Sequence, residues 1–278
     1  MAPRPSCRSR AARHWAGGLQ PEGEAPPWLV GWQPWAEALG WPAAGTLDLD
    51  RANAFAAARD CRSGSGQALR FVPAQTLSGP DLGYETIIFA QGQVPTRMTG
   101  RGGRHDFANA LAWLSFPQLK ARLNALHVEA LQGNNGSGRR GGLRDRATLF
   151  DESGALVLTD DETLAERLRQ FSWSGLFVEC RDAWGDRIRV VITGHALIEK
   201  LCAPYKSICA QALVLPASPA TAPDTIDAID AIAARALCPA ALQSLTPLPL
   251  MGIPGWSPAN HDPAFYNDPK VFRTGRQR

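Results

Sequence analysis

The sequence has few charged residues, very few lysines and no long hydrophobic run. Charged residues make up 20% of its 278 residues, and 29 basic against 26 acidic residues give a net charge of +3. So small a charge does not by itself indicate a nucleic-acid-binding protein. No apolar run approaches the length of a membrane span, so we expect no transmembrane helix. With 45% hydrophobic residues, the composition excludes a collagen-like, coiled-coil or largely disordered chain.

Several common motifs are missing as well. The six cysteines include no Cys-x-x-Cys pair and no spacing typical of a zinc site. The glycine-rich segment 133–146 lacks the residue order of a phosphate-binding P-loop. The sequence therefore identifies no metal or cofactor. We predict a reducing, cytoplasmic location, with buried thiols at four apolar positions: Cys180, Cys202, Cys209 and Cys238.

The amino-terminal part divides into two segments of different composition. Residues 1–27 are basic, rich in Pro, Gly and Arg, and have no apolar core of the kind found in secretory signals. We predict that they form a disordered leader and that residues 28–278 form a single domain. Four tryptophans follow, and we expect them to anchor this segment on the core, although such a cluster could also hold a ligand. They are Trp28, Trp32, Trp35 and Trp41.

Hydrophobic periodicity and turn residues predict a mixture of helices and short strands. The strongest signal is a helical region over 105–131, divided by Pro117, which suits the first turn of its second half. Further helices are predicted over 48–60, 161–170, 195–202 and 224–237. Strands are predicted over 68–72, 84–90, 148–150, 155–158, 187–193 and 208–215. Without regular βαβ alternation this pattern predicts an α+β fold, which ends in an extended Pro/Gly-rich tail from Thr246.

Some local details accompany these elements. We expect a hairpin around residues 151–154, with Asp151 and Glu152 as turn acids. We expect Thr159 and Glu162 to form a capping box for the helix that follows. On the helix after Pro117, Lys120 is expected to point outward.

His105 is the first candidate for chemistry. His105, Asn109 and Trp113 follow one another at intervals of four residues, so they share one face of a helix. His105 could act as a general base or metal ligand, with Asn109 as a positioning donor. Alternatively, Asp106 caps the helix and His105 satisfies a backbone carbonyl.

Two further pairs are candidates. His195 and Glu199 lie four residues apart after Gly194, so they could share a metal, or the glutamate could orient the imidazole. A plain hydrogen-bonded pair is the alternative.

Arg144 and Asp145 end the segment 133–146, which we expect to be a flexible loop. Arg144 could bind an anionic substrate, or the two residues could form a salt bridge that closes the loop.

Several ordered motifs resemble a bacterial protein family of unassigned role, domain of unknown function 3025. The resemblance covers about residues 84–273 and rests on the stretches 84–97, 105–126, 144–156, 194–201, 247–256 and 262–273. It implies that these segments belong to one domain. The family name implies no activity and no catalytic residues.

These observations lead to two main hypotheses. The first is a hydrolase-like enzyme in which the polar candidates meet in one cleft, acting on a small anionic substrate, with segment 133–143 as a lid. The second is a non-catalytic binding or assembly protein that uses its Trp-rich start and Pro-rich tail. Nucleic-acid binding through Arg139 and Arg140 has the least support, because acids balance the bases. The residues assigned to the cleft are His105, Asp106, Asn109, Arg144, Asp145, His195 and Glu199.

Overall fold

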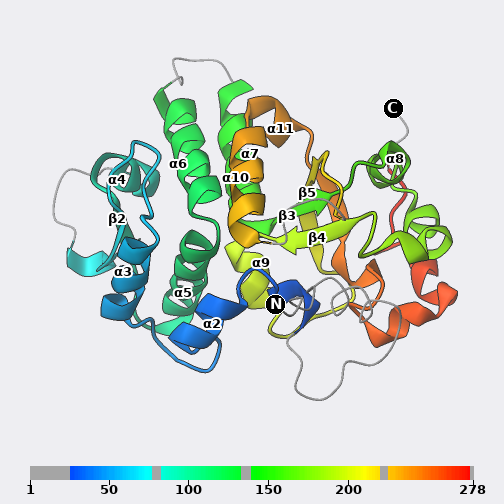
Figure 1. Ribbon diagram of the computed structural model, residues 1–278, viewed down its shortest axis with the longest axis horizontal. Helices are drawn as coiled ribbons and strands as arrows, with labels where there is room; N and C mark the ends of the chain where they lie inside the picture. The colour runs from blue at the N-terminus through cyan, green and yellow to red at the C-terminus, as the bar shows by residue number, and fades with distance from the viewer. Residues whose placement is uncertain (1–25, 77–82, 133–138, 220–224, 276–278) are drawn as a thin grey trace, which may run out of the picture.

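A group of helices lies beside a four-stranded sheet, with the carboxy-terminal turns beyond the sheet (Figure 1). The computed structural model describes residues 26–76, 83–132, 139–219 and 225–275. The helices are α2 (Gln33–Leu39), α3 (Leu49–Ala58), α4 (Tyr84–Gln91), α5 (Gly100–Ser115), α6 (Pro117–Gln132), α7 (Arg139–Ser153), α8 (Glu162–Arg169), α9 (His195–Lys200), α10 (Ile226–Ala236) and α11 (Pro239–Gln243). The strands are β1 (Arg70–Pro73), β2 (Gln93–Thr96), β3 (Gly154–Leu158), β4 (Arg189–Ile192), β5 (Cys209–Leu215) and β6 (Thr246–Pro249). The predicted α+β class is confirmed.

The main sheet has the strand order β4-β3-β5-β6. Strand β3 pairs antiparallel with β4 and parallel with β5, and β5 pairs antiparallel with β6. Every residue of β3 is buried, because side chains pack against both faces of this central strand. A second, two-stranded parallel sheet joins β1 to β2. Among the described residues, no helix is both long and apolar enough to cross a membrane.

Helices α5 and α6 form the predicted pair, divided at Pro117. The apolar face of α5 is almost fully buried, and α6 packs against α7 and α10. The amino terminus of α6 is capped from another helix, because the carboxylate of Asp230 on α10 accepts hydrogen bonds from the backbone N–H groups of Gln118 and Leu119 at 2.9 and 2.8 Å. These bonds satisfy donors that a helix start otherwise leaves unpaired.

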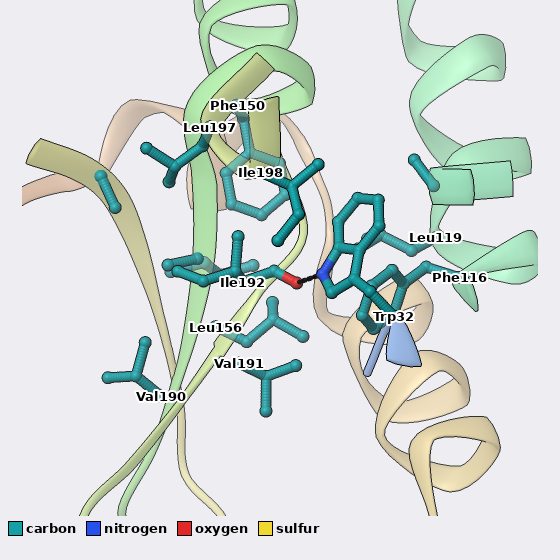
Figure 2. Close-up of a cluster of buried hydrophobic side chains, with 14 of the residues drawn as sticks. Trp32, Phe116, Leu119, Phe150, Leu156, Val190, Val191, Ile192, Leu197 and Ile198 are labelled. Atoms are coloured by element: carbon teal, nitrogen blue, oxygen red, sulfur yellow. Dashed lines mark hydrogen bonds between the residues drawn. The ribbon is translucent and has the colours of Figure 1, made fainter. Parts of the chain in front are cut away.

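The tryptophans of the amino-terminal segment pack on the core, as predicted. Trp32 has no exposed surface, and its indole Nε1 donates to the carbonyl oxygen of Ile192 at 2.7 Å. Figure 2 shows this bond, with the indole ring beside Phe116 and Leu119. The carboxy-terminal tail from Thr246 is also packed into the fold. Trp256 and Tyr266 are buried, and β6 belongs to the main sheet. Residues 1–25 of the predicted leader lie outside the described residues.

Three secondary-structure predictions are wrong. Residues 84–90, predicted as a strand, form helix α4, because Gly92 ends the helix at a φ of 68° and Ile88 packs in the core. Residues 139–146, predicted as loop, begin helix α7. The predicted hairpin does not form either, since residues 148–153 continue α7 directly into β3. Packing of α7 against α6 and α9 offsets the helix-breaking effect of its glycines.

Two predictions about side chains are also wrong. Asp161, and not Thr159, caps α8, since its carboxylate accepts from the backbone N–H groups of Thr163 and Leu164. The expected burial of four cysteines holds only in part, because Cys202 and Cys209 are exposed while Cys180 and Cys238 are half-buried. Among the cysteines in the described part of the chain, Cys61 is the one that is buried.

Candidate functional site

Two histidines that lie 90 residues apart in the sequence face each other. His105 is in the second turn of α5, and His195 is the first residue of α9, directly after β4 and Gly194. Their Nε2 atoms are 3.1 Å apart, and their ring centroids are 4.6 Å apart. Only 6% of the His195 side chain is exposed, against 30% of His105. His105 is therefore the member of the pair that solvent and ligands reach.

The surroundings determine which nitrogen of each ring carries the proton. His195 Nδ1 lies 2.9 Å from the backbone oxygen of Asp151. Because a carbonyl oxygen only accepts, His195 Nδ1 donates and its Nε2 is left as an acceptor. The Nε2–H of His105 then donates to His195. At its other nitrogen, His105 Nδ1 lies 3.8 Å from Glu199 Oε2.

The pKa of His195 is strongly lowered. Burial lowers its pKa from 6.5 to about 4, helped by the charge of Lys120 and by His105, whereas Asp151 acts in the opposite direction. For Asp151, burial works against the charged form, but Lys120 and His195 outweigh it and lower the pKa to about 2. At neutral pH, a neutral His195 therefore lies next to an ionised Asp151.

A buried ion pair lies behind the histidines. Lys120 Nζ is 2.5 Å from Asp151 Oδ1 and donates to Asn109 Oδ1 at 2.9 Å. Asn109 in turn donates to the hydroxyl of Tyr84 at 2.8 Å. Lys120 was predicted to point outward but is buried, with its ammonium group 5.3 Å from the centre of the Trp113 ring. Polar contacts thus run from Tyr84 through Lys120 and Asp151 to the histidines.

The histidine pair forms part of the wall of an open pocket of about 310 Å³, which we call the histidine pocket. Helix α7 contributes Arg144, Thr148 and Glu152, which are exposed. The pocket is lined by Tyr84, Glu85, Arg97, His105, Asp106, Asn109, His127, Arg144, Thr148, Asp151, Glu152 and His195. It therefore contains acid–base groups and an exposed arginine.

Of the predicted site residues, the structure brings His105, Asn109, Arg144 and His195 together in this pocket. Asp106 also lines it, but it is not a helix cap: α5 begins at Gly100, and the carboxylate of Asp106 holds the guanidinium and backbone N–H of Arg97.

The other two predicted residues lie differently. Glu199 faces His105 and Arg104, at 3.8 and 3.9 Å, and no hydrogen bond joins it to His195 among the described contacts. Asp145 is exposed and does not line the pocket. The polar residues expected to converge thus do so only in part.

Several residues of the site were not predicted, among them Tyr84, His127 and Asp151 in the pocket wall and Lys120 behind it. Asp151 was assigned to a hairpin turn because the carboxy-terminal end of α7 was not recognised as helix. Lys120 and His127 are seven residues apart on α6, so they share one face, and both are buried. The only sequence signal for them is this spacing of polar residues within an apolar pattern.

The pocket shows no evident metal-binding set. Within the described ranges, no three His, Cys, Asp or Glu side chains are grouped so that they could hold a metal ion. The two imidazole Nε2 atoms instead have the separation of a hydrogen bond. The geometry therefore joins the two rings by a single hydrogen bond.

Comparison with known proteins gives a family but no activity. No curated protein and no solved structure matches the chain. A family model described as "Protein of unknown function (DUF3025)" matches residues 69–276, which is most of the chain and includes every residue that lines the histidine pocket. The chain therefore belongs to the DUF3025 family.

Proposed function

We propose that the histidine pocket is the active site of a hydrolase-like enzyme that acts on a small anionic substrate. The observation that carries this proposal is the 3.1 Å contact between the Nε2 atoms of His105 and His195 at the pocket wall. A buried, neutral imidazole that fixes the tautomer of a more exposed one is an arrangement suited to general acid–base catalysis.

His105 would be the group that exchanges protons with a bound water. Its Nε2–H is engaged by His195, so the free lone pair of the neutral ring is on Nδ1. A proton taken from an attacking water would reside on Nδ1 and face Glu199, 3.8 Å away. The negative charge of Glu199 would stabilise the imidazolium, which could then return the proton to the leaving group.

Arg144 and Tyr84 would hold the substrate. Arg144 is an exposed arginine at the pocket wall and could bind a carboxylate or phosphate bidentately. The hydroxyl of Tyr84 accepts a hydrogen bond from Asn109, so its own hydrogen can be donated to a substrate oxygen.

The alternative, a binding or assembly protein, receives less support from the packing. The segments proposed as its interaction surface use their large aromatic residues internally: Trp32 and Trp41 are 0 and 7% exposed, and Trp256 is 3% exposed. Trp28 also contacts the Trp256 ring, with a distance of 5.7 Å between centroids. These side chains stabilise the fold and leave little apolar surface for a partner.

Hydrolysis of generic chromogenic esters tests the proposal. Purified full-length protein is assayed with p-nitrophenyl phosphate, bis-p-nitrophenyl phosphate and p-nitrophenyl acetate. His105→Gln should lower kcat about 100-fold or more, whereas the matched control His261→Gln, at an exposed position outside the pocket, should not. Arg144→Gln should raise KM for the phosphate monoester. Absence of turnover with all three probes, or equal activity of H105Q and H261Q, would contradict the proposal.

A further inference from the structure

We propose that Lys120 is a positioning residue: by pairing with Asp151 it keeps His195 neutral, so that the proton shared by the two histidines stays on His105. Its catalytic consequence rests on the proposed function above, but its test does not require turnover. Lys120 touches neither histidine in any described contact; it acts through Asp151, and its positive charge also disfavours a proton on His195.

Lys120 is held rigidly in place. Its ammonium group contacts Asp151 Oδ1 at 2.5 Å and Asn109 Oδ1 at 2.9 Å, and it lies over the Trp113 ring. Only 7% of its side chain is exposed. These partners come from α5 and α7, so the charge of Lys120 is fixed where these helices meet α6.

Asp151 connects this charge to the histidines. Its backbone oxygen accepts from His195 Nδ1, and its carboxylate Oδ2 lies 3.6 Å from the same nitrogen. An unpaired carboxylate at this distance would favour a protonated imidazole. The positive charge of Lys120 offsets the negative charge of the carboxylate, and the buried His195 ring therefore remains uncharged.

The other charged and titratable groups around His195 do not replace Lys120. His105 of α5 faces His195 directly, and a proton on His105 opposes a second one on His195. Glu199 of α9 acts on His105, with Arg104 beyond it. His127 of α6 faces Asp151, and the exposed α7 residues Arg144 and Glu152 lie at the pocket wall. Of these groups, Lys120 has the shortest contact with the Asp151 carboxylate.

The position of the shared proton decides what His105 can do. If His195 became protonated at Nε2, that atom would donate, and His105 Nε2 would have to accept. The remaining proton of His105 would then be on Nδ1, facing Glu199, and the one lone pair of the ring, on Nε2, would be engaged by His195 and could not take a proton from water. Lys120 therefore sets the tautomer in which His105 can act as a base.

The imidazole rings of the ¹⁵N-labelled full-length protein report this directly by NMR. Long-range ¹H–¹⁵N spectra give the tautomer and titration midpoint of His195 in the wild type, K120M, D151N, the double variant K120M/D151N and the control K200M. Lys200 is an exposed lysine at the end of α9. K120M should raise the His195 midpoint by about one pH unit or more, the double variant should bring it back to the wild-type value, and K200M should leave it unchanged.

Two results would overturn the proposal. One is a folded K120M whose His195 midpoint equals that of the wild type, and the other is a double variant that keeps the K120M value. If K120M does not fold, the D151N variant tests the proposal. D151N leaves the charge of Lys120 without its carboxylate, so it must lower the titration midpoint of His195. Loss of turnover in K120M without any change in His195 titration would refute the positioning role and leave the proposed function intact.

Discussion

Replacing Asp230 with asparagine tests whether the buried carboxylate on α10 that caps α6 makes the free energy of unfolding depend on pH. Asp230 has no exposed surface, and burial raises its pKa from 3.8 to about 6, although the hydrogen bonds from Gln118 and Leu119 act in the opposite direction. Asparagine keeps the shape of the side chain and one acceptor oxygen. It removes the charge that titrates and also one of the two hydrogen bonds from the start of α6, and the loss of that bond does not depend on pH.

The magnitude follows from the difference between the folded and unfolded pKa values. Because the folded-state value is the higher one, the stability that this group contributes is fully present below about pH 3.8 and is lost as the pH rises through about 6. About two pKa units correspond to about 3 kcal/mol of unfolding free energy. His195 acts in the opposite direction, because its pKa is lowered from 6.5 to about 4 and its contribution is lost as the pH falls through that window.

The two groups largely compensate in the wild-type profile, so the comparison must be made between variants. Urea unfolding of the wild type and Asp230→Asn from about pH 4 to about pH 7 should show the variant gaining about 3 kcal/mol relative to the wild type as the pH rises. Asp186→Asn, at an exposed position, is the control, and the pH-dependent gain of Asp230→Asn should exceed any change that this control shows. A constant difference for Asp230→Asn would refute the argument.

Three further predictions concern packing and titration. Trp32→Phe removes the N–H that Ile192 accepts and leaves a small void, so urea unfolding should show a loss of about 2–3 kcal/mol; a loss below about 0.5 kcal/mol would contradict this account. Gly194→Ala places a Cβ against the Gly154 backbone and 2.5 Å from the backbone oxygen of Glu152. It should lower the free energy of unfolding by roughly 3 kcal/mol in the same assay. Gly45→Ala, with open space around the added Cβ, should leave the free energy of unfolding almost unchanged. His195→Gln should lose about 3 kcal/mol of stability relative to the wild type as the pH rises from about 4 to about 6.5; a difference from the wild type that stays constant with pH would show that His195 is not the buried neutral group described.

The helices that could be predicted from the sequence are those whose own residues determine them. The pair α5 and α6 has a clear apolar periodicity and a proline at a position that starts a helix. Helix α7 could not be predicted, because the glycines near its start are unfavourable in a helix and its stability comes from contact with α6 and α9. Helix α4 was missed because Ile87 and Ile88 favour strands when only local preference is considered.

The candidate site was predictable to a similar extent. His105 and His195 stand out because they lie at helical positions with polar neighbours, but their contact depends on how α5 and α9 pack. Lys120 and Asp151 could not be found in this way. A lysine on an amphipathic helix normally points to solvent, and only a carboxylate from another helix makes its burial favourable.

The bond from Trp32 to Ile192 has a consequence for solubility. Strand β4 lies at one edge of the main sheet, and the turn Pro27–Leu29 packs against it. A bare edge offers unpaired N–H and C=O groups to a strand from another molecule, which is a route to aggregation. Here a tryptophan that precedes the family-matched residues 69–276 occupies one of those carbonyl groups. A chain trimmed to the family boundary would therefore expose this edge, and would be expected to associate with itself.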